Sequence, residues 1–245
     1  MTLFFDSHIT VNTKSFELDP SESKHISKVL RKKSGDKITV TNGKGLEWKG
    51  KLFYNKKNML VATKQIAIEH KKKIRKIQIA IAPTKSNHRM EWLVEKLTEI
   101  GVDRITPILC ERSERKVLKT KRLIKIAITA LKQSNNFFLP KIDEIIKFDE
   151  FLENNQNPIL IAHCSPRPTK LLVDYDSNFK KICLLIGPEG DFSTKEIEKA
   201  VTLGHTAVSL GDQRFRTETA GVLGCHLLYI HQPVSYTHLT LPTIE

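Results

Sequence analysis

Short apolar runs alternate, after residue 76, with stretches in which apolar residues recur every three or four positions. The apolar runs predict buried strands at residues 77–83, 105–110, 158–163, 182–186 and 206–210. The periodic stretches between them predict helices, of which the two clearest cover residues 90–100 and about 119–134. Apolar strands that alternate with helices predict an α/β fold, with a parallel sheet covered on both faces.

The helix predicted at residues 90–100 has an apolar face and a defined end. Its inward-facing residues are predicted to be Trp92, Leu93, Leu97 and Ile100. Gly101 follows at the position where a glycine commonly ends a helix, because it adopts the left-handed backbone conformation without strain. This helix is therefore predicted to pack on the parallel sheet.

The first 70 residues have a different pattern, in which apolar and polar residues alternate over short distances. Strands are predicted at residues 46–54 and 59–68, and Asn42–Gly43 is a strong hairpin signal ahead of them. One short helix is predicted from Pro20 to Leu30. We expect a small barrel or sandwich with basic edges, followed by a linker at residues 70–73.

The charge is concentrated in this first part of the chain. Of a net charge of +13, residues 1–76 carry +11, from 18 Lys and Arg against 7 Asp and Glu. A polyanion such as nucleic acid would bind such a surface through the release of counterions. A solvated lysine-rich face is the alternative interpretation, but the segregation of the charge favours a nucleic-acid partner.

The remaining composition excludes several classes of protein. The 245 residues are 40% hydrophobic and 27% charged, which is typical of a globular protein. No apolar run approaches the roughly 18 residues of a membrane span, and the first residues do not resemble a secretory signal. The four cysteines, Cys110, Cys164, Cys183 and Cys225, are too scattered to suggest a zinc site or a disulfide framework. We therefore expect a cytoplasmic protein without metal and without a membrane partner.

The candidate chemistry lies in two loops that follow predicted strands. The first loop contains Gly187–Pro188–Glu189–Gly190, and a helix with a capping-box spacing begins at Ser193. A tight turn without a ligand is an alternative interpretation of this loop. The phosphate-binding patterns of ATP-binding and dinucleotide-binding proteins are absent from the sequence. In parallel sheets, however, ligands bind beyond the carboxyl ends of the strands, where this loop is predicted to lie.

The second loop contains Arg214 and Arg216 ahead of a predicted helix start at Thr217–Glu218. A hydroxyl and a carboxylate at this position are typical of helix capping. A guanidinium at the ligand end of a sheet usually meets an anion. For Arg216, an ion pair with Glu218 or Glu189 is the structural alternative.

Several ordered motifs, which together extend from about residue 3 to residue 231, resemble one family. They include L-L-I-G-P-E-G-D-F-S-x-x-E-I and S-L-G-x-x-R-F-R-T-E-T-A in the two loops, V-E-K-L-T-E-I-G-V at 94–102, E-R-S-E-R-K at 111–116, K-Q-S-N-N-F-F-L-P at 132–140 and H-I-S-K-V-L-R at 25–31. These motifs are similar to those of the RsmE family of 16S rRNA uracil N3-methyltransferases, which belong to the SPOUT superfamily.

The resemblance implies a fold and a division of labour that no residue pattern shows. It implies a SPOUT-type methyltransferase domain with a trefoil knot at residues 71–232, which binds S-adenosylmethionine and forms a homodimer. It also implies a PUA-like β-barrel at residues 1–70, which helps to bind the 16S rRNA of the small ribosomal subunit. Residues 233–245 do not resemble the family and read like a translated cloning or sequencing adaptor, so we expect no functional role for them.

The resemblance also implies site residues. Those for the cofactor are His163, Ile186, Gly187, Glu189, Gly190, Ser209, Leu210, Gly211, Phe215, Arg216 and Thr217. By their charge and predicted position, the candidates for contacts with RNA phosphates are Arg31, Lys32, Lys33, Arg89 and Arg112, any of which could instead be solvated. His163 could equally be a satisfied core histidine. The sequence departs from the family at Phe215, where an aliphatic residue is common, at Asp191, where glycine is frequent, and at residues 85–89, which match only loosely.

Methylation of uracil N3 requires a proton to leave the nitrogen while negative charge develops on the O2–N3–O4 edge. Arg216 is the candidate for stabilising that charge, and Glu218 the candidate for accepting the proton unless it only caps its helix. Two rival functions remain open at this point. One is another SPOUT methyltransferase that acts on a ribose 2′-hydroxyl or on tRNA, and the other is a non-catalytic RNA-binding ribosome-assembly factor.

Overall fold

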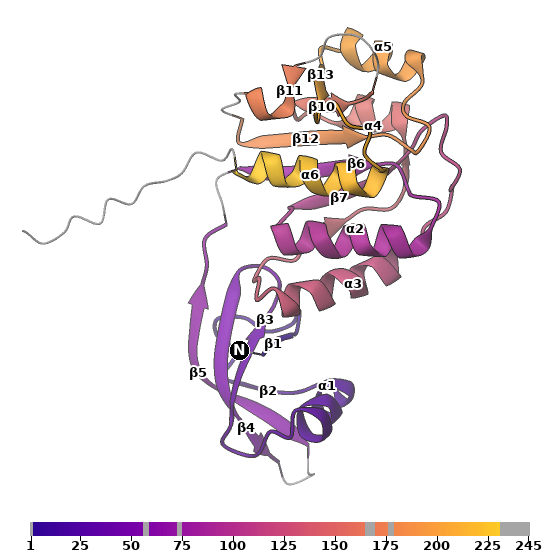
Figure 1. Cartoon of the computed structure of the whole chain (residues 1–245). Coiled ribbons are helices and arrows are strands. Elements are labelled where there is room, and N and C mark those ends of the chain that lie inside the picture. The colour runs from indigo at the N-terminus through magenta and orange to yellow at the C-terminus, as the bar shows by residue number, and fades with distance from the viewer. Residues whose placement is uncertain (1, 56–58, 73–74, 165–169, 176–178, 231–245) are drawn as a thin grey trace, which may run out of the picture.

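The chain folds into an N-terminal β-sheet and a C-terminal α/β layer structure. The computed structural model describes residues 2–55, 59–72, 75–164, 170–175 and 179–230. Figure 1 shows the two parts one above the other. The residues predicted to form a non-native tail, 233–245, lie outside the described residues.

The N-terminal sheet has five strands in the order β1-β3-β4-β5-β2. Their bounds are β1 Leu3–Phe5, β2 Ser15–Glu17, β3 Lys37–Thr41, β4 Leu46–Tyr54 and β5 Leu60–Glu69. The sheet encloses a core around the fully buried Trp48, whose indole donates a hydrogen bond to the Thr13 carbonyl at 2.9 Å. A register shift at Lys49 and Gly50 interrupts the β4–β5 pairing, and such a bulge bends the strand that carries it.

The predicted hairpin and helix of this part are both present. Strands β3 and β4 pair antiparallel, and the turn between them contains Asn42 and Gly43. The predicted helix forms in two pieces, α1 (Pro20–Lys24) and the π-helical turn η1 (His25–Val29).

The C-terminal part is built on a sheet in the order β11-β13-β10-β12-β6-β7-β8, with β9 paired to β7. Each described strand pair of this sheet is parallel. The strands are β6 Lys76–Ile81, β7 Arg104–Leu109, β8 Lys141–Ile142, β9 Ile146–Lys147, β10 Ile159–Ala162, β11 Lys170–Leu171, β12 Lys181–Ile186 and β13 Thr206–Ser209. The helices are α2 Asn87–Ile100, α3 Thr120–Gln133, α4 Phe148–Asn154, η2 Leu172–Asp174, α5 Thr194–Thr202 and α6 Thr217–Ile230.

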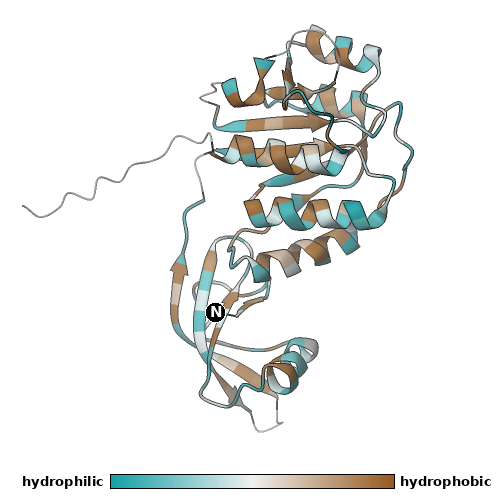
Figure 2. Cartoon of the chain, viewed as in Figure 1, coloured by the Kyte–Doolittle hydropathy of each residue, from teal (hydrophilic) through white to brown (hydrophobic). Residues whose placement is uncertain are grey.

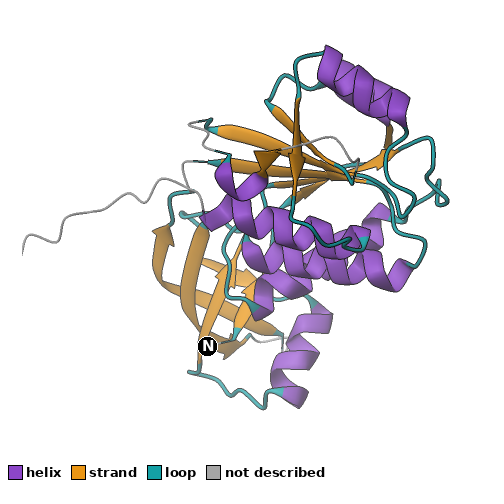
Figure 3. Cartoon of the chain, turned by 45° about the horizontal axis from the view of Figure 1, so that its top comes forward, coloured by secondary structure: helices purple, strands orange, loops and turns teal. Residues whose placement is uncertain are grey.

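Helices cover both faces of this sheet, as the sequence predicted. Alternate residues of one strand serve the two cores: Ile77, Ile79 and Ile81 belong to the core with α2, α3 and α6, whereas Ala80 belongs to the core with α4 and α5. Figure 2 shows β12 brown along most of its length, while α2 and α3 carry mixed brown and teal. Figure 3 shows the helices packed against the orange strands from another side. The buried strands therefore read as continuous apolar runs because both of their faces are covered.

One expectation about α2 is wrong. Trp92 was expected to face inward, but it is 38% exposed. The buried residues of α2 are Met90, Leu93, Val94, Leu97 and Thr98. Their spacing of three and four residues defines a narrow seam, and Trp92 lies beside that seam. Gly101 ends the helix in the left-handed conformation, as predicted, with φ at 98°.

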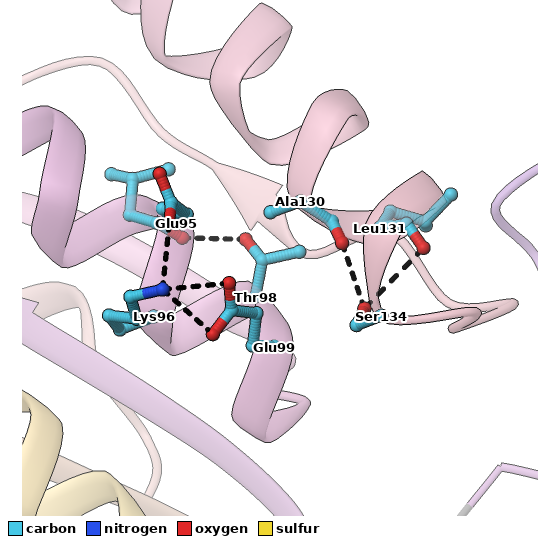
Figure 4. Close-up of polar contacts among 8 residues, drawn as sticks. Glu95, Lys96, Thr98, Glu99, Ala130, Leu131 and Ser134 are labelled. Carbon is cyan, nitrogen blue, oxygen red and sulfur yellow. Dashed lines mark hydrogen bonds and ion pairs between the residues drawn. The ribbon is translucent and has the colours of Figure 1, made fainter.

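The end of α3 and the loop that follows it connect the two parts of the protein. Figure 4 shows the Ser134 hydroxyl donating to the carbonyls of Ala130 and Leu131, which closes the last turn of α3. The following loop pairs with the N-terminal hairpin, because Gly45 N donates to Phe137 O and Leu139 N donates to Gly43 O, each at 2.8 Å.

Figure 4 also shows the exposed side of α2, where Lys96 bonds to Glu95 and Glu99. These hydrogen bonds, that to Glu95 foremost, raise the pKa of the Lys96 ammonium above its usual value. The pair with Glu99 has the three-residue spacing at which side chains of one helix meet, so it supports α2 locally.

Helix α6 approaches the sheet closely because it carries glycines on its buried side. A Cβ at Gly224 would lie 2.3 Å from Leu184 Cδ2, and one at Gly221 would lie 2.8 Å from Ile81 Cδ1. Both contacts are shorter than side chains tolerate in a packed core. The trefoil knot implied by the family resemblance stays a prediction.

Replacing Gly224 with alanine should therefore lower the free energy of unfolding by about 1–3 kcal/mol, because overpacking a core costs that much. The substitution also favours the helix by about 1 kcal/mol, so packing and propensity oppose each other, and we expect packing to dominate. Urea denaturation followed by far-UV circular dichroism measures the change. The control His226→Ala, at an exposed position of the same helix, should stay within about 0.5 kcal/mol of the wild type. A Gly224→Ala protein as stable as the control would contradict the close packing.

Candidate active site

A cavity of about 380 Å³ opens at the carboxyl ends of β10, β12 and β13. This is the edge of a parallel sheet at which ligands bind, and the volume lies in the usual range for small-molecule sites. Its lining includes six of the residues predicted to bind a cofactor, namely His163, Ile186, Ser209, Leu210, Gly211 and Phe215. It also includes residues that the sequence did not single out for a ligand: Ala162, Cys164, Asp212, Gln213, Arg214 and Ala220.

Five of the predicted cofactor residues do not line this cavity. They are Gly187, Glu189, Gly190, Arg216 and Thr217. The hydrogen bonds of the loops that carry these residues show how the backbone is held there.

The loop after β12 is held by a residue that departs from the family pattern. Asp191 has a φ of 62°, a left-handed conformation that explains why glycine is frequent at this position. Asp tolerates this conformation better than most residues, and its carboxylate accepts hydrogen bonds from Phe192 N at 2.8 Å and Cys164 N at 2.9 Å. Asp191 thereby connects the loop after β12 to the end of β10, at the carboxyl edge of the sheet.

Gly187 allows this loop to fold back on itself. A Cβ at Gly187 would lie 3.0 Å from the backbone nitrogen of Phe192 and 3.1 Å from its ring. A larger residue would push the two halves of the loop apart.

The capping box predicted at the start of α5 is confirmed. Ser193 Oγ accepts from Glu196 N at 3.3 Å, and the Glu196 carboxylate accepts from Ser193 N at 2.8 Å. The second oxygen of the same carboxylate accepts from Glu111 N at 2.8 Å. The helix start is therefore joined to the loop that follows β7.

That loop, which carries the E-R-S-E-R-K motif, holds two neighbouring loops in place. Arg112 donates to the Gly190 carbonyl at 2.8 Å, and Arg115 donates to the Lys85 carbonyl and to the Asn87 side chain. Glu189 accepts from Lys85 N at 3.0 Å, so it orients its loop. Arg112 was predicted to contact RNA phosphate, and the structure places its guanidinium on a carbonyl of the loop after β12.

The helix start at Thr217 does not follow the capping interpretation. The buried Thr217 hydroxyl donates to the Gly187 carbonyl at 3.1 Å, so it joins the two motif loops to each other. Glu218 is 6% exposed, and its Oε2 has no hydrogen-bond partner among the described residues. Its other oxygen lies 3.6 Å from Arg89 Nε on α2. Burying a carboxylate oxygen without a partner is costly, which marks Glu218 as a functional candidate.

Arg216 is exposed and forms no ion pair with a described residue. The two partners considered from the sequence are engaged elsewhere, since Glu218 faces Arg89 and Glu189 accepts from the Lys85 backbone. Its role toward an anionic ligand stays a prediction. His163 is 8% exposed and also lines the cavity, so it is both a buried residue and a residue of the candidate site.

The remaining predicted RNA contacts lie far from these loops in sequence. Arg31 and Lys33 are exposed, whereas Lys32 Nζ donates to the Lys37 carbonyl at 3.0 Å. Arg31 has a φ of 53°, directly after the turn η1. Arg89 was predicted as a phosphate contact, and the structure places it beside Glu218.

Among the described residues, no group of His, Cys, Asp and Glu side chains has the arrangement of a metal site, and no helix is long and apolar enough to cross a bilayer. Cys110, Cys183 and Cys225 are buried, and burial raises the pKa of each thiol above its usual value. These three cysteines are packing residues with little thiolate character.

Two family models match the chain in the order of its two parts. The model described as an RNA methyltransferase domain matches residues 70–229, and the model described as an RNA methyltransferase PUA domain matches residues 18–63.

Individual proteins agree with this assignment. Ribosomal RNA small subunit methyltransferase E of Buchnera aphidicola is 29% identical over 90% of this chain and 89% of its own length. The protein of the same name from Synechocystis is 30% identical over 83% of this chain and 69% of its own length.

Solved structures resemble the whole chain. A "probable rRNA-methyltransferase" of Porphyromonas gingivalis superposes with a TM-score of 0.87 and 36% identity, over 95% of this chain and 98% of its own. Ribosomal RNA small subunit methyltransferase E of Neisseria gonorrhoeae, bound to S-adenosyl methionine, superposes with a TM-score of 0.83 and 26% identity, over 94% and 97%. The chain therefore belongs to the RNA methyltransferase family, as a member of its ribosomal RNA small subunit methyltransferase E group.

Proposed function

We propose that this protein methylates N3 of a specific uridine in the 16S rRNA of the small ribosomal subunit, with S-adenosylmethionine as the methyl donor. The observation that carries the proposal is the position of Glu218, a buried carboxylate with an unpartnered oxygen, on the first turn of α6. The same turn carries Ala220, which lines the cavity at the sheet edge. A proton acceptor next to a ligand cavity is what methylation of an N–H group requires.

The cavity residues fit this cofactor. Backbone groups at Ile186, Leu210 and Gly211 would hold it, since these residues lie where β12 and β13 end and the chain turns away from the sheet. Ile186, Leu210 and Ala220 offer apolar contact, and Asp212, Gln213 and Arg214 offer polar groups. When bound, the sulfonium supplies an activated methyl group, so the protein contributes mainly orientation. Gly187, Glu189 and Gly190 would act by shaping the loop.

The reaction forms a bond between the methyl carbon and N3, breaks the methyl–sulfur bond and releases the N3 proton. Glu218 would accept that proton on its unpartnered oxygen. Arg216, which lies two residues earlier and is exposed, would stabilise the negative charge that spreads over O2, N3 and O4. In one step, Glu218 would thus remove the proton and Arg216 would stabilise the negative charge that the proton leaves behind.

The basic N-terminal sheet would contribute affinity for the RNA. Arg31, Lys32 and Lys33 carry the charge that phosphates require, while selection of the nucleotide belongs to the active site. We further propose that the protein acts as a homodimer and works in the cytoplasm on the ribosomal subunit.

Replacing Glu218 with glutamine should lower the rate of methyl transfer by about 10²-fold or more, because the amide cannot accept the proton. S-adenosylmethionine affinity should be unchanged, since Glu218 does not line the cavity. Single-turnover transfer of labelled methyl to small subunits that lack the modification measures the rate, and calorimetry measures the affinity. The exposed carboxylate of Glu150 offers a matched control, and Glu150→Gln should react within about twofold of the wild type. A Glu218→Gln enzyme that keeps the wild-type rate would eliminate Glu218 as the proton acceptor.

Replacing Arg216 with alanine should slow the same reaction by about 10²–10³-fold, the usual effect of removing one group that stabilises developing charge. Arg216→Lys should recover part of the rate, because it keeps the charge but not the planar guanidinium. Digestion of the labelled RNA to nucleosides identifies the product.

Label in 3-methyluridine supports the proposed function. Label on a ribose or on tRNA would assign the protein to another branch of the SPOUT methyltransferases. Cofactor binding without transfer to any RNA would favour a non-catalytic role in ribosome assembly.

A further inference from the structure

The first turns of α2 and α6 bring Arg89 and Glu218 together, although 128 residues separate the two in the sequence. The helices pack closely there, because a Cβ at Gly221 would lie 3.0 Å from Leu93 Cδ1, one turn further along each helix. The side chains therefore meet at a place that the packing of two helices determines.

The contact between the two side chains does not satisfy the hydrogen-bonding capacity of either one. Arg89 Nε and Glu218 Oε1 are 3.6 Å apart, which is too long for a good hydrogen bond. Glu218 Oε2 has no partner among the described residues, and the Arg89 side chain is 39% exposed against 8% for Glu218. The guanidinium offsets the charge of the carboxylate, and its N–H groups remain available on the open side.

A carboxylate only accepts hydrogen bonds and a guanidinium only donates them. Side by side, Glu218 and Arg89 thus present an acceptor next to a donor. The Watson–Crick edge of uracil presents the complement, an N3–H donor next to a carbonyl acceptor. Cytosine presents an N3 lone pair, which faces the carboxylate unfavourably, and an amino group, which can place a donor against the guanidinium.

We propose that Arg89 and Glu218 together read the target base, so that Arg89 determines specificity for uracil over cytosine. Glu218 accepts the N3–H hydrogen bond, and Arg89 donates to the neighbouring carbonyl oxygen. This inference rests on the proposed function, and it replaces the role of phosphate contact that the sequence suggested for Arg89. It also links selection to chemistry, since the hydrogen bond that recognises uracil is the path by which the N3 proton leaves.

Rejection of the wrong base follows from the burial of Glu218 together with the register that the reaction requires, in which N3 of the base faces the carboxylate. A buried polar group that loses its partner costs far more than one in water, so a cytosine held with N3 toward Glu218 would leave the carboxylate unsatisfied. A residue that only contacts phosphate has no such effect, because phosphates are the same for every base.

The test compares binding of two 16S rRNA fragments that differ only in carrying uridine or cytidine at the position that the wild-type protein methylates. Wild-type protein, measured without the methyl donor so that no transfer occurs, should prefer the uridine fragment by about tenfold or more, as expected for a paired base contact. Arg89→Gln should lose most of this preference. The matched control is Arg31→Gln, which should weaken both fragments equally and reduce the salt dependence of binding by about one unit of slope.

Two further measurements keep the outcome interpretable. S-adenosylmethionine affinity of Arg89→Gln should equal that of the wild type, because Arg89 does not line the cavity, and this shows that the variant is folded. Arg89→Lys should bind both fragments but discriminate less well than the wild type, since a lysine lacks the planar donor pair.

The inference is overturned if Arg89→Gln weakens both fragments equally and lowers the salt slope, which is the behaviour of a phosphate contact. It is also overturned if Arg89→Gln keeps the wild-type preference for uridine. Either result can occur while wild-type protein produces 3-methyluridine, so the proposed function would survive. If the wild-type protein methylates no uridine, both the proposed function and this inference are wrong.

Discussion

The parallel direction of the strands is the constraint on which this structure depends. Because β10, β12 and β13 run in the same direction, their carboxyl ends meet at one edge of the sheet. Each of these strands continues there into a loop. Backbone groups of loops need hydrogen-bond partners outside the sheet, and a ligand can supply them. The position of the cavity therefore follows from the topology of the sheet, and not from any single side chain.

Hydrogen bonds join the loops at that edge to each other. The Thr217 hydroxyl bonds to the Gly187 carbonyl, the Asp191 carboxylate reaches Cys164 N, and Arg112 reaches the Gly190 carbonyl. Each bond joins segments that follow different strands. Such bonds restrict the loops before a ligand binds, which lowers the cost of ordering the site on binding. Gly187, Glu189, Gly190 and Thr217, which do not line the cavity, take part in this network, whereas Arg216 does not.

Glu218 and its neighbours show how a fold maintains an otherwise unfavourable group. Helix α6 lies close to the sheet because Gly221 and Gly224 lack side chains, and this closeness buries the carboxylate at its start. Arg89 partly offsets the cost through its charge, but does not remove it with a hydrogen bond. Stability is given up at this position, and such positions are commonly functional.

Much of the architecture could be predicted from local patterns alone. Apolar runs identified the parallel strands, alternation identified the N-terminal sheet, and the Ser193–Glu196 spacing identified the start of α5, because each depends on residues that are close in the chain. The position of Trp92 beside the helix seam, the Thr217–Gly187 bond and the Arg89–Glu218 contact could not be predicted in this way. They depend on the rotation of a helix against a sheet and on which loops become neighbours. Only packing of the complete chain sets those quantities, so the sequence determined the elements and the tertiary structure decided which side chains meet.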